Sequence, residues 1–272
     1  MAKIRGMAVF EEAPVKLVVN GKTLVTFMCT PQALDELAVG YLYSLGHISG
    51  LEDIESYRVS KDLEKVSVCT KDVLPAEQYS LDHVLSTADG TGSLFLEKLS
   101  QNQRVNSNFT INQSKLQDLS RQMKAAAVLY KETGGVHCAG LANESKLVAW
   151  REDIGRHNAI DKVIGEALFI GADLSQHFII TTGRLAAEMV LKAAAGRTPL
   201  MVSRSIPSNL AVEFAEKLGI TLVGRAFGPH PVVYTHPWRV TTKGSKASGQ
   251  GDGSAVQSNR GQACLIAISP EW

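Results

Sequence analysis

The chain has 272 residues, a formal net charge of +1, and a composition that is 44% hydrophobic and 20% charged. This length allows one large domain or two smaller ones with a sizeable core. A net charge near zero provides no extended field for nucleic acid or an anionic membrane, so any anion must be bound locally. No apolar run approaches the ~18 to 20 residues of a membrane span and the N-terminal stretch lacks a long apolar core, so we expect a cytoplasmic protein.

Residues 1–85 predict a small α+β domain. The segments VKLVV and TLVTFMC flank Asn20-Gly21, a dipeptide typical of a hairpin turn. The segment TPQALDELAVGYLYSLG predicts a helix, with Thr30 as its N-cap, Pro31 at the first helical position and Gly46 after its end. The segments IESYRV and KVSVCT predict a second hairpin.

Two stretches are expected to lie outside the compact domains. Residues 86–114 are dominated by Gly, Ser, Asn and Gln, which predicts an exposed loop or connection. Residues 240–272 are rich in Gly, Ser and Gln, and we expect a disordered tail there. Between them, the segment KLQDLSRQMKAAAVLYKE predicts one helix that ends at Gly134-Gly135.

Residues 115–239 predict an α/β domain. After a hairpin made by VHCAGL and KLVAW, residues 157–170 have the apolar spacing of a helix. Strand HFIITT, helix RLAAEMVLKAAAG, strand PLMVSR, helix PSNLAVEFAEKLG and strand ITLVG then follow. This β-α-β-α-β order with short connections predicts parallel strands joined by right-handed crossovers.

Three loops should gather at the carboxyl ends of these parallel strands, where open α/β sheets bind their ligands. They are TTGR (residues 181–184), SRS (203–205) and GRAFGPH (224–230), and each supplies an arginine. Their hydroxyl and guanidinium groups, together with the N–H groups of helices that start at the first two loops, suit a phosphate or pyrophosphate. The alternative is that the arginines pair with carboxylates, as Arg184 would if it shared a helix face with Glu188 and Lys192.

The segment REDIGRHNAIDK (residues 151–162) contains seven ionisable side chains. We interpret it as one wall of the binding site, with a solvated helix start as the alternative. His157 and Asp161 lie one helical turn apart, so the carboxylate is expected to orient the imidazole. The nearby segment TGGVHC adds two glycines, which permit close approach of a ligand to the backbone.

The segments ETGGVHCAGL, REDIGRHNAIDKVIG, TTGRLAAEMVLKAAAG, IPSNLAVEFAEKLGITLVG and VYTHP also carry a resemblance. Over residues 10–239 the chain resembles the formate dehydrogenase accessory proteins, the FdhD-type sulfur carriers. The resemblance implies an α/β fold with a cytidine deaminase-like three-layer core and a smaller α+β N-terminal domain. It also implies a ligand, the molybdenum bis-guanine-dinucleotide cofactor, with GDP as its mimic. Formate dehydrogenase and a cysteine desulfurase are the implied partners, and a homodimer is compatible with the family.

The sequence and the resemblance together give a set of candidate cofactor-binding residues, and no metal ligands. The family's nucleotide-recognition segment corresponds to residues 225–230, although GRAFGPH differs from the aromatic and basic version that is usual in the family. The full set is Gly134, Gly135, His137, Arg156, His157, Asn158, Asp161, Thr182, Gly183, Arg184, Ser203, Arg225, Ala226, Phe227, Gly228, Pro229 and His230.

The cysteines depart from the family pattern. The persulfide-bearing C-G-x-C loop of the family corresponds here to DGTG at residues 89–92, and neither aspartate nor glycine can hold a persulfide. Cys138 is the weak candidate for a substitute thiol, and the alternative is that it is buried and inert, as we expect of the isolated cysteines generally. Sulfur transfer is therefore doubtful.

Two functions follow from these observations. The first is a formate dehydrogenase maturation factor that binds the cofactor. The alternative is a non-catalytic regulator or chaperone that binds a guanine nucleotide or the cofactor. A zinc-dependent hydrolase of the deaminase type is not expected, because the sequence has no C-x-x-C pair and HCA at residues 137–139 lacks the required glutamate.

Overall fold

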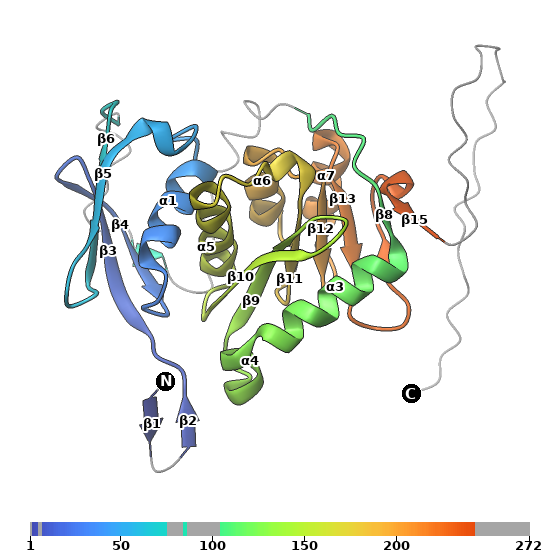
Figure 1. Ribbon diagram of the computed structural model, residues 1–272, viewed down its shortest axis with the longest axis horizontal. Helices are drawn as coiled ribbons and strands as arrows, with labels where there is room; N and C mark the ends of the chain where they lie inside the picture. Colours follow the sequence, from blue (N-terminus) through green and yellow to red (C-terminus); the bar gives the residue numbers. More distant parts are fainter. Residues whose placement is uncertain (1, 5–6, 75–83, 86–103, 243–272) are drawn as a thin grey trace.

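The computed structural model describes residues 2–4, 7–74, 84–85 and 104–242 (Figure 1). It is a mixed α/β fold with a five-stranded sheet in its N-terminal part and a six-stranded sheet in its C-terminal part. Two further pairs of strands are short: β1 (Ala2–Ile4) with β2 (Met7–Val9), and β8 (Ile111–Asn112) with β15 (Val240–Thr241). Strand β15 therefore extends two residues into the predicted tail. Residues 243–272 of that tail, with Cys264, and the DGTG segment lie outside the described residues.

The five-stranded sheet has the order β5-β6-β3-β4-β7. Its strands are β3 (Ala13–Val19), β4 (Lys22–Cys29), β5 (Ile54–Val59), β6 (Lys65–Thr70) and β7 (Val84–Leu85). Both predicted hairpins are confirmed, since β3 pairs with β4 and β5 pairs with β6 in antiparallel fashion. Asn20 and Gly21 have φ of 49° and 81°, the left-handed conformations that a type I′ turn requires.

Helix α1 (Leu34–Ser44) covers one face of this sheet, but its predicted start is wrong. The helix begins after Ala33, which has a left-handed φ of 51°. Thr30 does not cap it, because the Thr30 hydroxyl accepts a hydrogen bond from the N–H of Ile154 and the Thr30 N–H donates to Asp153. Thr30, which the local sequence pattern predicted as the N-cap, therefore forms hydrogen bonds to residues far away in the sequence instead. The predicted end is confirmed, with Gly46 at φ 69° following the C-cap.

The six-stranded sheet has the order β10-β9-β11-β12-β13-β14. It consists of β9 (His137–Ala142), β10 (Leu147–Asp153), β11 (Phe178–Thr181), β12 (Leu200–Ser203), β13 (Thr221–Gly224) and β14 (Val232–Val233). The parallel pairing of β11 with β12 and of β12 with β13 confirms the predicted crossover order. The intervening helices are α5 (Arg156–Phe169), before β11, then α6 (Ala187–Ala195) and α7 (Asn209–Leu218).

Helices cover both faces of this sheet, so the predicted three layers are present. Side chains of α3 (Gln113–Ala126) pack with Phe178, Ile180 and Val202 on one face, whereas α5, α6 and α7 belong to the core on the other. The predicted single helix is broken at Ala127, whose ψ is 95°, and resumes as α4 (Val128–Thr133). The short helices η1 (Leu51–Asp53), η3 (Leu174–Gln176) and η4 (Pro237–Arg239) lie in connections.

The two sheets are joined through α1 and α5, which lie side by side between them (Figure 1). A Cβ atom on Gly40 would lie 1.8 Å from the carbonyl oxygen of Asp161, and one on Gly165 would lie 2.0 Å from that of Glu36. The two backbones therefore touch at glycines, and one continuous hydrophobic core includes residues of both predicted domains. Among the described residues, none of the helices has the length and apolar character needed to cross a membrane.

Candidate functional site

The three predicted loops lie together at one edge of the six-stranded sheet. The N–H of Arg204 donates to the carbonyl of Thr181 at 3.1 Å, and the N–H of Arg225 donates to that of Ser205 at 2.9 Å. The N–H of Thr182 reaches the carbonyl of Cys138, which places the start of β9 at the same edge. We refer to residues 181–184, 203–205 and 224–230, with His137 and the first turn of α5, as the carboxyl edge.

The hydroxyl groups at this edge are already used to shape the loops. Thr182 Oγ1 accepts the N–H of Cys138 at 3.0 Å, and both residues are buried. Ser203 Oγ donates to the carbonyl of Gly183 at 2.6 Å and accepts the N–H of Ser205 at 2.8 Å. The expectation that these hydroxyls are open to a phosphate is therefore wrong, because each one holds a neighbouring loop.

The three arginines remain available to a ligand. Arg184, Arg204 and Arg225 are exposed, and within the described part of the chain none of them pairs with a carboxylate. Arg204 donates to the hydroxyl of Tyr130 on α4, a neighbour that no sequence signal indicated. Helices α6 and α7 begin only after the loops have ended, so the predicted helix starts inside them are wrong and Arg184 does not share a helix face with Glu188.

The segment 225–230 divides into a buried part and an exposed part. Ala226 is fully buried and Phe227 is half-buried against the core beneath α3. The carbonyl of Gly228 accepts a hydrogen bond from Gln117 on α3 at 2.8 Å. Pro229 and His230 are exposed, as is Arg225. Only the exposed residues and the Phe227 ring can therefore meet a ligand directly.

The first turn of α5 brings two further side chains to the edge. Arg156 packs over Gly183. A Cβ atom added to Gly183 would lie 2.9 Å from the Cβ atom of Arg156. Burial, Lys192, Arg156 and His137 lower the pKa of His157 to about 3. Burial, Arg156 and Arg184 also lower the pKa of His137, against the opposing effect of Asp153. Both imidazoles are therefore neutral at pH 7 in a positively charged surrounding.

Most of the charge in REDIGRHNAIDK points into the protein rather than to the site. Asp153 is fully buried and accepts hydrogen bonds from Lys162 at 2.6 Å, Asn158 at 3.0 Å and the N–H groups of Thr30 and Gly155. Asn158 also donates to the carbonyl of Met28. Asn158 therefore fastens the β10–α5 turn to the end of β4, behind the edge.

Asp161, like Asp153, is buried and bonded to other side chains of the protein. Its carboxylate accepts hydrogen bonds from Lys192 at 2.6 and 2.8 Å and from Ser44 at 3.0 Å. Burial raises the pKa of Asp161, and the Lys192 ammonium and the Ser44 hydroxyl oppose that shift. The expected contact with His157 is wrong, because neither ring nitrogen of His157 has a hydrogen-bond partner in the part of the chain that the structure describes.

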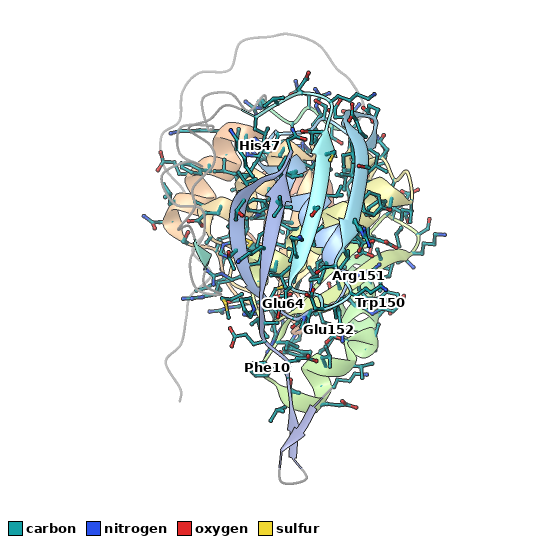
Figure 2. All side chains as sticks on the ribbon, turned by 90° about the vertical axis from the view of Figure 1, so that its left-hand side faces the viewer. Phe10, His47, Glu64, Trp150, Arg151 and Glu152 are labelled. Atoms are coloured by element: carbon teal, nitrogen blue, oxygen red, sulfur yellow. The ribbon has the colours of Figure 1, made fainter. Side chains whose placement is uncertain are left out.

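The two glycines of TGGVHC serve the protein's own packing. Gly134, at φ 63°, ends α4. A Cβ atom on Gly135 would lie 2.3 Å from the ring of Phe10, so Phe10 occupies the space that was expected for a ligand. Figure 2 shows Phe10 below Glu152, whose carboxylate accepts the first N–H groups of α4.

The described cysteines provide no activated thiol at the edge. Cys29 and Cys138 are buried and Cys69 is exposed. Burial and the charge of Glu152 raise the pKa of Cys138 well above its usual range, so the thiol stays protonated. The predicted burial of Cys138 is therefore confirmed, and the prediction that it is inert stays a prediction. No group of three His, Cys, Asp or Glu residues able to hold a metal occurs within the described ranges.

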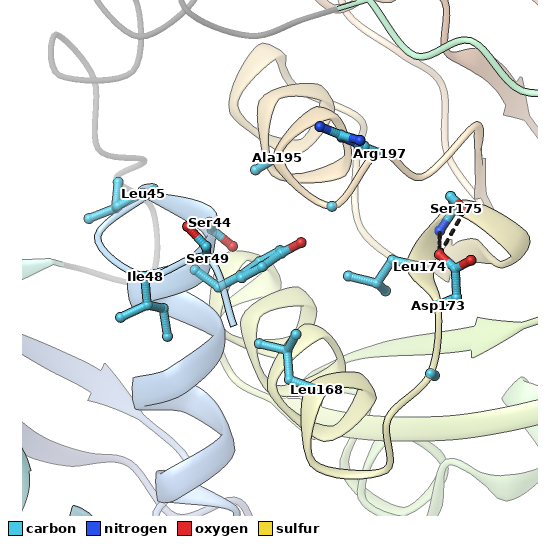
Figure 3. Close-up of a pocket in the computed structure, with 14 residues that line it drawn as sticks. Ser44, Leu45, Ile48, Ser49, Leu168, Asp173, Leu174, Ser175, Ala195 and Arg197 are labelled. Atoms are coloured by element: carbon cyan, nitrogen blue, oxygen red, sulfur yellow. Dashed lines mark hydrogen bonds between the residues drawn. The ribbon is translucent and has the colours of Figure 1, made fainter. Parts of the chain in front are cut away.

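A cavity of about 780 Å³ lies elsewhere (Figure 3). It is lined by residues at the C-terminal ends of α1, α5 and α6 and by the η3 segment, including Ser44, Leu168, Asp173 and Arg197. The carboxyl edge is at the opposite end of α5 and α6. Helix C-termini present carbonyl oxygens, which do not favour a phosphate. The cavity is therefore separate from the carboxyl edge.

Comparisons with known proteins agree with this architecture. The FdhD/NarQ family model matches residues 10–241. The sulfur carrier protein FdhD of Bacillus subtilis (strain 168) is 33% identical over 233 residues, which cover 84% of this chain and 88% of that protein. The FdhD protein of Xanthomonas oryzae pv. oryzae is 34% identical, covering 84% of each chain. A solved structure of a protein described as a formate dehydrogenase accessory protein, from Desulfotalea psychrophila, matches with a TM-score of 0.70 and 27% identity over 86% of this chain and 90% of that one.

Proposed function

The chain belongs to the FdhD/NarQ family, and on this premise we propose that it is an accessory protein of formate dehydrogenase. Its cargo would be the molybdenum bis-guanine-dinucleotide cofactor of that enzyme, bound at the carboxyl edge. The observation that carries the proposal is the convergence of three exposed arginines, Arg184, Arg204 and Arg225, on one edge of a parallel sheet without carboxylate partners among the described residues.

The chemistry of this edge suits a dinucleotide. Guanidinium groups grip phosphate oxygens in pairs, and the arginines come from three adjacent loops, so they can follow a diphosphate along the sheet edge. The half-buried ring of Phe227 offers an apolar face on which a base can stack. The neutral rings of His137 and His157 add hydrogen-bonding groups without opposing the positive charge.

We propose binding and delivery of the cofactor rather than sulfur carriage. A sulfur carrier needs an accessible thiolate, and the position of the family's cysteine loop holds DGTG here. Cys138 is buried with a raised pKa, and burial likewise raises the pKa of Cys29 to about 12. Cys69 is exposed, but it lies on β6 of the five-stranded sheet and not at the carboxyl edge. Formate dehydrogenase is then the expected partner. A cysteine desulfurase is a partner only if another thiol of the chain accepts sulfur.

The proposal is tested by expressing the chain with a formate dehydrogenase, purifying it, and measuring bound molybdenum and acid-released guanine nucleotide. We expect both in a fixed ratio. Guanine nucleotide without molybdenum would instead favour a nucleotide-binding regulator. Incubation with a cysteine desulfurase and cysteine, followed by mass spectrometry, tests the sulfur step. A mass increase of one sulfur atom on any cysteine, with transfer to the cofactor, would contradict the restriction to binding.

A further inference from the structure

Within the described ranges, no side chain caps the N-terminus of α5. Gly155 stands at the N-cap position, and no acidic residue lies in the first turn of this 14-residue helix. By contrast, Asn112 caps α3 and Ser208 caps α7. The first N–H groups of a helix carry partial positive charge and bind anions when no side chain covers them.

The His157 ring in this same turn is a second, independent observation. The residue is only 8% exposed, and neither its Nδ1 nor its Nε2 atom has a hydrogen-bond partner among the described residues. Buried polar atoms nearly always have partners, so this ring indicates a group that the protein receives from outside. The neighbouring charges that act on it at pH 7 are those of Lys192 and Arg156, and both are positive.

These surroundings select the class of ligand. The carboxylate nearest in sequence on the helix, Asp161, is already bound by Lys192 and Ser44. A metal cation would face the charge of Arg156, and the described ranges supply no third His, Cys, Asp or Glu to complete a metal site. A buried imidazole that donates one hydrogen bond, a guanidinium group and helix N–H groups together suit a tetrahedral oxyanion.

We propose that the first turn of α5, with Arg156 and His157, forms an oxyanion subsite of the carboxyl edge. The contact of Arg156 with Gly183 holds its side chain beside the TTGR loop, so the subsite is continuous with the loop that carries Arg184. This inference rests on the proposed function and deepens it. The subsite would take either the diphosphate of the dinucleotide or oxo groups at the metal end of the cargo, because both would present anionic oxygen atoms that accept hydrogen bonds.

The experiment is a calorimetric titration of the full chain with two probes, inorganic pyrophosphate and sodium molybdate. Wild type is compared with His157→Phe, which keeps an aromatic ring but removes both nitrogens, and with His177→Phe as the control. His177 is half-buried on the connection before β11, where its Nδ1 lies 2.6 Å from the carbonyl oxygen of Asp173, outside the carboxyl edge. We expect His157→Phe to weaken binding of the oxyanion by about 10-fold or more, because a buried hydrogen bond to a charged group is lost. His177→Phe should bind as wild type does.

A second variant keeps the proposal testable if His157→Phe does not fold. Arg156→Met keeps an apolar stem over Gly183 and removes the charge, and it too should weaken binding by about 10-fold. Adding GDP to the complex of the chain with the oxyanion distinguishes the two parts of the cofactor that the subsite could hold, the diphosphate and the metal end. If GDP displaces the bound oxyanion, the subsite holds the diphosphate. If GDP and the oxyanion bind at the same time, the subsite holds the metal end of the cofactor.

Equal oxyanion affinity in wild type and both variants would overturn the proposal. So would the absence of oxyanion binding to a folded wild type that still binds GDP. Conversely, a wild type that binds oxyanions through His157 but does not bind GDP contradicts the proposed function and leaves the subsite standing.

Discussion

Replacing Lys162 with Met tests whether the buried charges behind the carboxyl edge hold the protein together. The ammonium group of Lys162 lies 2.6 Å from Asp153, with both side chains 0% exposed, and it also donates to the carbonyl of Thr30 at 2.9 Å. Removing it leaves the carboxylate of Asp153 buried without a counter-charge, which costs about 3–5 kcal/mol. For a chain of this size, that loss lowers the melting temperature by roughly 6–20 °C.

Lys217→Met provides a matched control. Lys217 and Glu213 lie 2.7 Å apart, nearly the same distance, but their side chains are 63% and 56% exposed on α7. An exposed pair of this kind stabilises a helix by only about 0.3–0.5 kcal/mol. Urea denaturation followed by tryptophan fluorescence measures both variants. Similar losses of unfolding free energy in the two variants would refute the reasoning, because burial would then make no difference to the value of an ion pair.

Three further outcomes follow from the structure. The unfolded chain protonates His157 near pH 6.5 but the folded chain does so only near pH 3, so stability falls as the pH drops through this window. In His157→Phe the slope of unfolding free energy against pH between 4 and 6 should be shallower by about 1.4 kcal/mol per pH unit, and an unchanged slope would count against a buried neutral ring. Gly165→Ala should destabilise the chain by about 2 kcal/mol or more in thermal melts, because its methyl group would lie 2.0 Å from the carbonyl oxygen of Glu36. A neutral effect would mean that α1 and α5 can separate without loss. Iodoacetamide under native conditions should label exposed Cys69 but not Cys138, as peptide mass spectrometry can show, and rapid labelling of Cys138 would reopen its candidacy as a sulfur acceptor.

Local patterns were sufficient to predict most of the fold. The Asn20-Gly21 hairpin and the parallel order of β11, β12 and β13 follow from turn chemistry and from alternating strand and helix segments, which act within a few residues. The same local information placed the three arginine loops at one edge, since the carboxyl ends of parallel strands necessarily meet there.

The roles of polar residues inside the site segment could not be predicted in this way. Asp153, Asn158 and Lys162 look like a solvated or ligand-facing cluster in the sequence, yet their partners Met28 and Thr30 are more than a hundred residues away. Which charges turn inward depends on how α1 packs against α5, and periodicity carries no information about that contact. The start of α1 was misplaced for the same reason, because Thr30 bonds across this interface instead of capping the helix.

The most direct test of the central claim is calorimetric titration of GDP into the full chain. We compare wild type with Arg184→Ala, Arg204→Ala and Arg225→Ala, and with Arg58→Ala, an exposed arginine on β5 of the other sheet. The account predicts that GDP binds to wild type, that each carboxyl-edge variant loses about 10-fold in affinity, and that Arg58→Ala is unaffected. No GDP binding by folded wild type, or equal affinities across all variants, would contradict the assignment of the carboxyl edge as the cofactor site.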